Sequence, residues 1–341
     1  MRDINLFFAV DNNYCPFLSS TLTSIFANAS KKYNYNLYVL HSGVSEEYQE
    51  MIKNQVEGIA NITFVDMKEK LELFSNKLVT RDYYTKTTYY RLFIPNMFPK
   101  LKKALYLDSD IIVEGDISKL YNTPLLNNLV GAVPDAVIAN IEVFNEYASK
   151  VLGVRYDKYF NAGILLMNLT EMRKFKFEEK FIDLLQKYTF TVAQDQDYLN
   201  VLTKDRVRYI DYSWNTMPIE NNVYTSKKIS LIHYNMLWKP WIFDNTLYSE
   251  TFWKYAKQCP FYENIMKIKQ NHSTESRNNM LAGGEKLIKL AKEEIENPYN
   301  YNKMYNKPNE NKSILNNETD LLSIMQDEFD ALTAYQRKLK I

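Results

Sequence analysis

Short apolar runs alternate with helical patterns through the N-terminal part of the chain. The β-rich runs Ile4–Val10, Leu37–His41 and Ile62–Val65 are separated by polar turns and amphipathic segments. Pro16 marks the start of a helix after the first run, and Ser45 is a candidate N-cap for a helix after the second. Strands that alternate with helices in this way predict a parallel sheet covered by helices.

Further apolar runs end beside polar residues. Ala104–Leu107 stops abruptly at Asp108-Ser109-Asp110, before the apolar run Ile111–Val113. Ile164–Met167 and Leu231–Tyr234 predict additional strands. Two acids between buried strands carry a large desolvation cost unless a cation or a donor pairs with them. The acid pair is therefore the first candidate for a functional site.

The pattern changes after about Tyr262, so we expect a main domain over residues 1–262 and an α-helical extension over 263–341. Segments 270–279 and 297–317 are polar and Asn-rich, which predicts linkers. Helical periodicity marks Glu285–Glu296 and a last segment with apolar residues at near-heptad spacing. These apolar residues are Leu322, Met325, Phe329, Leu332 and Leu339. We expect the extension to lie outside the main site, packed on the main domain or on a partner, including an oligomer formed through the last helix.

The composition is typical of a folded protein and does not indicate a nucleic-acid partner. Of 341 residues, 46% are hydrophobic and 24% charged, and 42 Lys and Arg nearly cancel 41 Asp and Glu. This balance argues against nucleic-acid binding. Neither a signal peptide nor an apolar run of membrane-spanning length is found, and only Cys15 and Cys259 are present. We expect a cytoplasmic protein, with peripheral contact at the inner face of the membrane left open.

The acid pair Asp108 and Asp110 has the spacing of a metal site. Two carboxylates at the end of a buried strand can bracket a divalent cation, and open α/β sheets bind ligands at strand ends. The spacing alone is weak evidence, because Asp195-Gln196-Asp197 matches it too. A metal ligand is nevertheless favoured over a surface turn for the first copy.

His233 and Lys239 extend this site. A histidine on an apolar run is often a buried structural residue, and that alternative stays open. As a ligand, His233 would add nitrogen to two carboxylates, a mixed set that suits Mn²⁺. Lys239 precedes Pro240-Trp241, a rigid turn that would present its ammonium to a phosphate.

Six motifs in a fixed order resemble those of the family 8 glycosyltransferases, which include bacterial lipopolysaccharide α-galactosyl- and glucosyltransferases and glycogenin. The resemblance covers about residues 1–262. It implies a GT-A fold, which is a Rossmann-like, mostly parallel sheet flanked by helices, together with UDP-sugar and Mn²⁺ binding. The motifs are Phe8–Tyr14, Thr88–Leu92, Tyr106–Asp110, Phe160–Gly163, Gln194–Asp197 and His233 through Lys239-Pro240-Trp241.

The resemblance implies a retaining hexosyltransferase of cell-surface polysaccharide biosynthesis. It would move galactose or glucose from a UDP-hexose to a saccharide, glycolipid or glycoprotein acceptor, with Mn²⁺ or, as the alternative, Mg²⁺. Two other functions stay open. A nucleotidyltransferase acting on sugar phosphates would be expected to carry a Gly-rich loop, which Asp11–Tyr14 lacks. A catalytically inactive paralogue that only binds sugar nucleotides is the second.

Roles for individual residues follow from the resemblance by position. The metal ligands would be Asp108, Asp110 and His233. The uridine would be held by Ala9, Asp11, Asn13 and Tyr14, with Ser109 near the ribose. Arg91 would contact the donor near its diphosphate or its sugar, and Lys239 would meet the β-phosphate. The donor sugar would be held by Asn161, Ala162 and Asp195. Gln196 would lie below the anomeric carbon, which makes Gln196 and Asp195 the candidate catalytic residues.

Two features qualify these roles. Family members usually have Gly three residues after the histidine, where this chain has Met236, so its side chain either points away or narrows the site. A neutral amide such as that of Gln196 is a poor nucleophile, which favours same-face attack by the acceptor over a double displacement. Taken alone, Asn161-Ala162-Gly163 is also typical of a strand entry and Gln194–Asp197 of a helix N-terminus.

Overall fold

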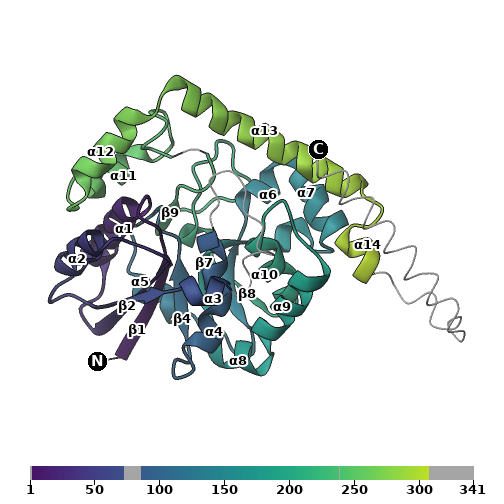
Figure 1. Cartoon of the computed structure of the whole chain (residues 1–341), viewed down its shortest axis with the longest axis horizontal. Coiled ribbons are helices and arrows are strands. Elements are labelled where there is room, and N and C mark those ends of the chain that lie inside the picture. Colours follow the sequence, from purple (N-terminus) through teal and green to yellow (C-terminus); the bar gives the residue numbers. More distant parts are fainter. Residues whose placement is uncertain (1, 73–85, 238, 307–341) are drawn as a thin grey trace, which may run out of the picture.

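The structure, a computed structural model, describes residues 2–72, 86–237 and 239–306. Seven strands form one mixed sheet in the order β3-β2-β1-β4-β7-β6-β8 (Figure 1). Four of its pairings are parallel, and β7 runs antiparallel to both neighbours. The strands are β1 (Arg2–Ala9), β2 (Tyr33–His41), β3 (Asn61–Asp66), β4 (Ala104–Leu107), β6 (Val130–Pro134), β7 (Phe160–Met167) and β8 (Val207–Tyr209). The predicted mostly parallel sheet is thus confirmed.

The direction of β7 has a functional consequence. Because β7 is antiparallel to β4, Leu107 pairs with Ile164, and the first residues of β7 lie beside the end of β4. A separate two-stranded sheet pairs β5 (Ile111–Val113) with β9 (Leu231–His233), with Ile111 opposite His233. Both pairings bring motifs that are distant in sequence to one edge of the main sheet.

Helices cover both faces of the sheet (Figure 1). The first half of the chain supplies α1 (Cys15–Asn28), α2 (Glu46–Gln55), α3 (Lys68–Glu72), α4 (Ile94–Met97), α5 (Ile117–Tyr121), α6 (Ala136–Asn140) and α7 (Glu142–Glu146). The second half supplies α8 (Leu169–Lys174), α9 (Phe177–Lys187), α10 (Asp195–Thr203), α11 (Ser249–Ala256), α12 (Tyr262–Asn271), α13 (Thr274–Glu296) and α14 (Tyr301–Tyr305). Short 3-10 or π turns are η1 (Lys86–Phe93), η2 (Tyr147–Val151), η3 (Tyr156–Lys158) and η4 (Tyr212–Trp214).

Strand β1 shows how the sheet separates two cores. Ile4, Leu6 and Phe8 point into a core built with α1, α2, α11 and α12, whereas Phe7 points into a second core that includes α9, α10 and α13. Successive side chains of a strand face opposite sides, so a strand buried on both faces reads as one continuous apolar run. That is the pattern by which the sequence predicts this strand.

Helix α1 is buried and carries hydroxyl groups toward the neighbouring strand. The Thr21 hydroxyl oxygen lies 2.8 Å from the carbonyl oxygen of Ser109 and 2.7 Å from that of Ile111. Ser24 accepts a hydrogen bond from the backbone N–H of Val113 at 2.9 Å. These contacts satisfy backbone groups that the short strand β5 leaves unpaired, and they fix the turn that carries the acid pair.

The C-terminal segment differs from expectation in two parts. Within the predicted linker 297–317, Tyr301–Tyr305 forms α14. Residues 270–279, predicted as a linker, are mostly helical, because α12 continues to Asn271 and α13 begins at Thr274. Ser273 caps α13 by accepting from the N–H of Ser276, and burial of Leu287 and Ala291 against the second core supplies the stability that the local composition lacks. The predicted helix around Leu322–Leu339 lies outside the described residues.

Helix α13 runs along one side of the molecule from α12 to α14, past α6 and α7 (Figure 1). The periodic segment Glu285–Glu296 is helical, as predicted, and it packs on the main domain through Leu287 and Ala291. Among the described residues, no helix is both long and apolar enough to cross a lipid bilayer.

Candidate active site

A cavity of about 400 Å³ opens at the edge of the sheet where the motifs meet. Its size lies within the range of small-molecule sites. All of the candidate site residues predicted from the sequence line this cavity. They are Ala9, Asp11, Asn13, Tyr14, Arg91, Asp108, Ser109, Asp110, Asn161, Ala162, Asp195, Gln196, His233 and Lys239.

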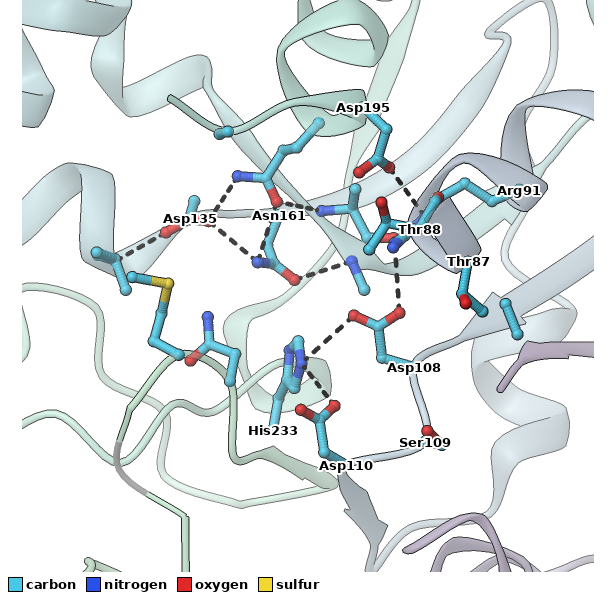
Figure 2. A pocket seen from close by; sticks show the side chains of 18 of the residues that line it. Thr87, Thr88, Arg91, Asp108, Ser109, Asp110, Asp135, Asn161, Asp195 and His233 are labelled. Carbon is cyan, nitrogen blue, oxygen red and sulfur yellow. Dashed lines mark hydrogen bonds and ion pairs between the residues drawn. The ribbon is translucent and has the colours of Figure 1, made fainter. Parts of the chain in front are cut away.

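Asp108, Asp110 and His233 converge at one end of the cavity (Figure 2). One ligand atom from each lies within 4.8 Å of the others. His233 Nε2 is 3.3 Å from Asp110 Oδ1 and 3.7 Å from Asp108 Oδ2. The buried imidazole faces the two carboxylates and not an apolar core on another face, as the prediction of a shared ion requires. Two oxygen donors and one nitrogen donor face a common point, as a divalent transition metal requires.

The tautomer of His233 follows from its neighbours. Asn215 donates from its side-chain amide to Asn161 Oδ1 at 3.2 Å, which leaves Asn215 Oδ1 as an acceptor. That oxygen is 3.0 Å from His233 Nδ1, so Nδ1 carries the proton and Nε2 presents its lone pair to the carboxylates. His233 Nε2 is buried, and no described residue forms a hydrogen bond with it. A histidine that binds a metal through one ring nitrogen usually donates the N–H of the other to an acceptor in this way, which fixes the orientation of the ring.

Gly163 makes the convergence sterically feasible. A Cβ atom at this position would collide with His233 Cε1 and Asp108 Oδ2, and would come within 3.0 Å of Asn161 Oδ1. The backbone N–H of Asp108 also donates to the Gly163 carbonyl oxygen at 2.8 Å. A side chain here would displace two of the three candidate ligands, so glycine is required by close approach.

Lys239 lies beside the same cluster. Its ammonium donates to Asp110 Oδ2 and, at 3.0 Å, to the Tyr234 carbonyl oxygen. Burial opposes ionisation of Asp110, yet the Lys239 ammonium beside it holds the pKa of this carboxyl well below its usual range. Asp110 is therefore an anion that can accept a metal ion. Trp241, stacked on Phe17 with ring centroids 3.9 Å apart, holds the turn that presents Lys239.

Arg91 links Asp108 to Asp195. Its guanidinium is 3.4 Å from Asp108 Oδ1 and 3.0 Å from Asp195 Oδ2, and it donates to the Ala162 carbonyl oxygen at 2.6 Å (Figure 2). The guanidinium also lies over the Tyr106 ring, 4.4 Å from its centroid. Burial raises the pKa of Asp195 to about 7, although Arg91 opposes the shift. Arg91 thus sets the position and the charge of one wall.

Gln196 is held at the opposite wall by four hydrogen bonds. Its amide nitrogen donates to Asp135 Oδ2 at 3.1 Å and to the Tyr159 hydroxyl at 3.3 Å. Its amide oxygen accepts from the Ala162 N–H at 2.9 Å and from Asn161 Nδ2 at 3.2 Å. Asp135 also accepts from Asn161 Nδ2 at 3.0 Å (Figure 2). The orientation of the Gln196 amide is therefore fixed.

The second acid pair in the sequence does not form a second metal site. Asp195 faces the cavity, whereas Asp197 is fully buried and accepts hydrogen bonds from the Tyr159 and Tyr147 hydroxyls at 2.7 and 2.8 Å. Burial raises the pKa of Asp197 to about 6 despite these bonds. Tyr159 also accepts from Gln196, and Asp197 accepts from the N–H of Ala193, which lines the cavity, so Asp197 supports the cavity through both residues.

The end of β1 and the following turn line the far end of the cavity. Asp11 Oδ1 accepts from the Tyr14 N–H at 3.0 Å, which closes the turn before α1. Ala9 and Asn13 line this end too, and the Tyr14 ring is 5.6 Å from the Lys239 ammonium. A carboxylate, an amide and a ring are thus within reach of one planar ligand.

The Met236 side chain was expected either to point away from the site or to narrow it, and α13 was expected to lie outside the site. Met236 lines the cavity, with φ of 57°, in the left-handed region that glycine usually occupies. Its side chain therefore does narrow the site. Leu287 of α13 lines the same cavity, so the expectation that this helix lies outside the site is wrong at this residue.

Three contributing residues have no sequence signal as clear as the acid pair. Asp135 follows the apolar run of β6 and caps α6, which strand-end reasoning could have found. Asn215 and Thr21 lie in a coil and on a helix and touch the site only through tertiary contacts. No periodicity or spacing marks them.

Comparison with known proteins agrees with this geometry. Residues 5–245 match the family model Glycosyl transferase family 8. Glycosyltransferase GlyB of Streptococcus pneumoniae is 31% identical over 277 residues, 75% of this chain and 62% of that protein. Lipopolysaccharide 1,2-glucosyltransferase of Escherichia coli K12 is 28% identical, over 70% of this chain and 72% of that protein.

A solved structure of the galactosyltransferase LgtC in complex with donor and acceptor sugar analogues is similar to this chain. It superposes with a TM-score of 0.63 at 27% identity, covering 75% of this chain and 96% of that one. The fold is therefore of the GT-A type, and the chain belongs to glycosyltransferase family 8. Its Asp108, Asp110 and His233 cluster could bind a metal ion.

Proposed function

We propose that the protein is a retaining hexosyltransferase that moves galactose or glucose from a UDP-hexose to a hydroxyl group of a saccharide, glycolipid or glycoprotein, with Mn²⁺ as the metal. The observation that carries this proposal is the cluster of the half-buried Asp108 with the buried Asp110 and His233 at one end of a cavity that holds Gln196 at its opposite wall. The related glucosyl- and galactosyltransferases support a hexose donor.

The residues present fit a metal ion. His233 Nε2 is buried with its lone pair toward two carboxylates, and Gly163 leaves room beside them. One nitrogen and two carboxylates suit Mn²⁺ better than Mg²⁺, which prefers oxygen ligands alone. Asp108, Asp110 and His233 would hold the ion, which would supply positive charge for the departing diphosphate.

The chain's own cations would share in stabilising the leaving group. Lys239 and Arg91 both carry charge into the cavity wall, and each is held there by a carboxylate, Asp110 and Asp195 respectively. Preorganised charges of this kind stabilise developing negative charge without reorganisation during the reaction. In this proposal Asp11 and Tyr14 bind the uracil ring, and Lys239 meets the β-phosphate.

Gln196 would act on the sugar as an electrostatic partner. Its amide oxygen already accepts two hydrogen bonds, from Ala162 N–H and Asn161 Nδ2, and a neutral amide so engaged is a weak nucleophile. This supports same-face attack by the acceptor hydroxyl, with the Gln196 dipole stabilising positive charge on an oxocarbenium-like sugar. Asp195 and Asn161 would orient the sugar hydroxyls beside it.

A screen of UDP-sugars tests the proposal. UDP-galactose, UDP-glucose, UDP-N-acetylglucosamine and UDP-glucuronic acid are each incubated with Mn²⁺ or with EDTA, and released UDP is measured. We expect Mn²⁺-dependent release from a UDP-hexose, and an α-linked product when an acceptor is present. A nucleotidyltransferase would instead form pyrophosphate from UTP and a sugar phosphate. Tight UDP binding without turnover of any donor would contradict the proposal.

A further inference from the structure

One wall of the cavity is made of apolar side chains from five separate segments of the chain. Ile138 and Phe144 come from α6 and α7, Val192 precedes α10, Met236 follows β9, and Leu287 comes from α13. Ile138, Phe144, Val192 and Leu287 are each at most 7% exposed, and Met236 packs on the same cluster. We name these five residues the apolar wall.

The apolar wall adjoins the sugar end of the cavity. Ile138 lies three residues after Asp135, and Val192 four residues before Gln196. Asp135 and Gln196 are hydrogen-bonded to each other, so the wall begins where the polar contacts to the anomeric centre end. In same-face transfer the acceptor hydroxyl must approach beside the departing diphosphate. An acceptor bound on the diphosphate side of the donor sugar would have the sugar between it and Gln196, and would extend along the cavity toward the apolar wall.

Helix α13 is built into this arrangement. Leu287 and Ala291 are buried in the second core, and Gly284 lies close enough to Leu237 that an added Cβ would be 3.0 Å from Leu237 Cδ1. The helix thus packs on the loop that carries Met236. Figure 1 shows α13 beside α6 and α7, which carry the other wall residues. Residue 287 lies beyond the family-matched residues 5–245, so the helix adds a surface that the shared catalytic part does not contain.

The chemistry of the wall selects its ligand. A sugar carries hydroxyl groups on most of its carbons, and each one buried without a partner carries a substantial cost. The five side chains offer no N–H or O–H group to such hydroxyls. An alkyl chain or an aryl ring needs none, and gains free energy by leaving water. Apolar surface beside a hexosyl-transfer site thus matches an acceptor sugar with an apolar substituent.

We infer that the acceptor is an amphiphilic glycoside, whose sugar hydroxyl attacks the anomeric carbon of the donor while its apolar aglycone binds the apolar wall. Leu287 of α13 is then a residue that determines acceptor specificity. The inference rests on the proposed transferase function and names the class of acceptor for it. The donor residues are not involved in this choice.

The test compares acceptors that differ only in the aglycone. Methyl and octyl glycosides of glucose, galactose and lactose are used below the micelle-forming concentration, with the full chain, Mn²⁺ and the preferred UDP-hexose. We expect kcat/KM for the octyl glycoside of the accepted sugar to exceed that for the methyl glycoside at least tenfold, mainly through a lower acceptor KM. Hydrolysis of the UDP-hexose without acceptor is measured in parallel.

Substitutions in the wall separate a binding role from a structural one. Leu287→Gln should reduce the octyl-to-methyl ratio to within about twofold, and Leu287→Met should keep it because an apolar side chain remains. Leu281→Gln is the matched control on the same helix, at a residue that is 40% exposed and does not line the cavity. Val192→Thr adds one hydroxyl at nearly constant volume and should lower the ratio in case Leu287→Gln does not fold.

The outcomes distinguish this inference from the proposed function. UDP-hexose hydrolysis together with equal transfer to methyl and octyl glycosides, or with no transfer to any octyl glycoside, would overturn the inference alone. A ratio that survives in folded Leu287→Gln and Val192→Thr would do the same. Absence of hydrolysis with every UDP-sugar would overturn the proposed function, and the inference with it.

Discussion

The two walls of the cavity hold their side chains by different forces. At the metal end, Asp108, Asp110 and His233 are positioned by ion pairs and hydrogen bonds that leave little geometric freedom. At the other end, residues such as Phe144 and Leu287 are positioned by packing within a shared apolar cluster. Electrostatic contacts fail when one partner is removed, whereas apolar packing tolerates volume-conserving exchange. One end is therefore suited to fixed chemistry and the other to variable specificity.

The comparison predicts its largest effect at the metal end. Asp110→Asn removes one ligand charge at constant volume and should lower Mn²⁺-dependent sugar transfer by about 1000-fold, because both metal affinity and the partner of Lys239 are lost. Initial rates over a Mn²⁺ series measure this. Asp244→Asn, an exposed aspartate paired with Lys269, is the control and should retain the rate. Full activity of Asp110→Asn at saturating Mn²⁺ would show that the Asp110 carboxylate is not a metal ligand.

Gly163→Ala probes steric rather than charge requirements at the same end. The added methyl group would displace His233 and Asp108, so we expect at least about a 100-fold loss of Mn²⁺ affinity. Titration followed by the electron paramagnetic resonance of free Mn²⁺ measures it. Gly283→Ala is the matched control, since a Cβ there meets nothing within 4 Å. Unchanged affinity in Gly163→Ala would show that the ligands do not share one ion.

A smaller effect is expected from Asp197, whose folded pKa of about 6 lies above the ordinary value of about 3.9. The folded state therefore holds this proton more tightly, and the free energy of unfolding falls as pH rises from about 4 to about 6. Asp197→Asn removes this contribution. The free energy of unfolding of the variant, relative to that of wild type, should therefore rise by up to about 3 kcal/mol between pH 4 and pH 7.

Denaturant unfolding in metal-free buffer at several pH values measures this relative change. Only the pH-dependent difference between the variant and wild type is used, because Asn also changes the hydrogen bonds to Tyr147 and Tyr159. A difference that stays constant from pH 4 to pH 7 would show that Asp197 keeps an ordinary pKa in the folded protein.

The smallest effect is expected on α13. Gly283 is helical and has open space around its Cα, so Gly283→Ala should stabilise the protein by about 0.5 to 1 kcal/mol through the backbone entropy of the unfolded chain. Thermal unfolding measures the shift. A loss of stability instead would show that the helix relies on a close contact at this glycine, and would make the wall less tolerant than the comparison assumes.

What the sequence reveals follows the same division. The strand-end residues were predictable because an apolar run predicts a buried strand, and acids that directly follow it, such as Asp108 after Leu107, predict a binding site at its end. Asp135 and Asn215 were missed because their roles depend on contacts across the chain, with Gln196 and His233. Helix α13 was predicted only in part, because its Asn- and Gly-containing first half has low helix propensity and gains its stability from packing.

Met236 shows that one backbone shape can be kept with a different residue. Holding a non-glycine residue in the left-handed region costs about 1 to 2 kcal/mol in the folded state. Against this, a residue with a Cβ has fewer conformations to lose than glycine, which recovers about 0.4 to 1 kcal/mol. The second term offsets only part of the first and leaves a net cost of about 1 kcal/mol. The loop after His233 therefore keeps its path with or without a side chain, and the identity of residue 236 is free to follow the shape of whatever molecule enters the cavity.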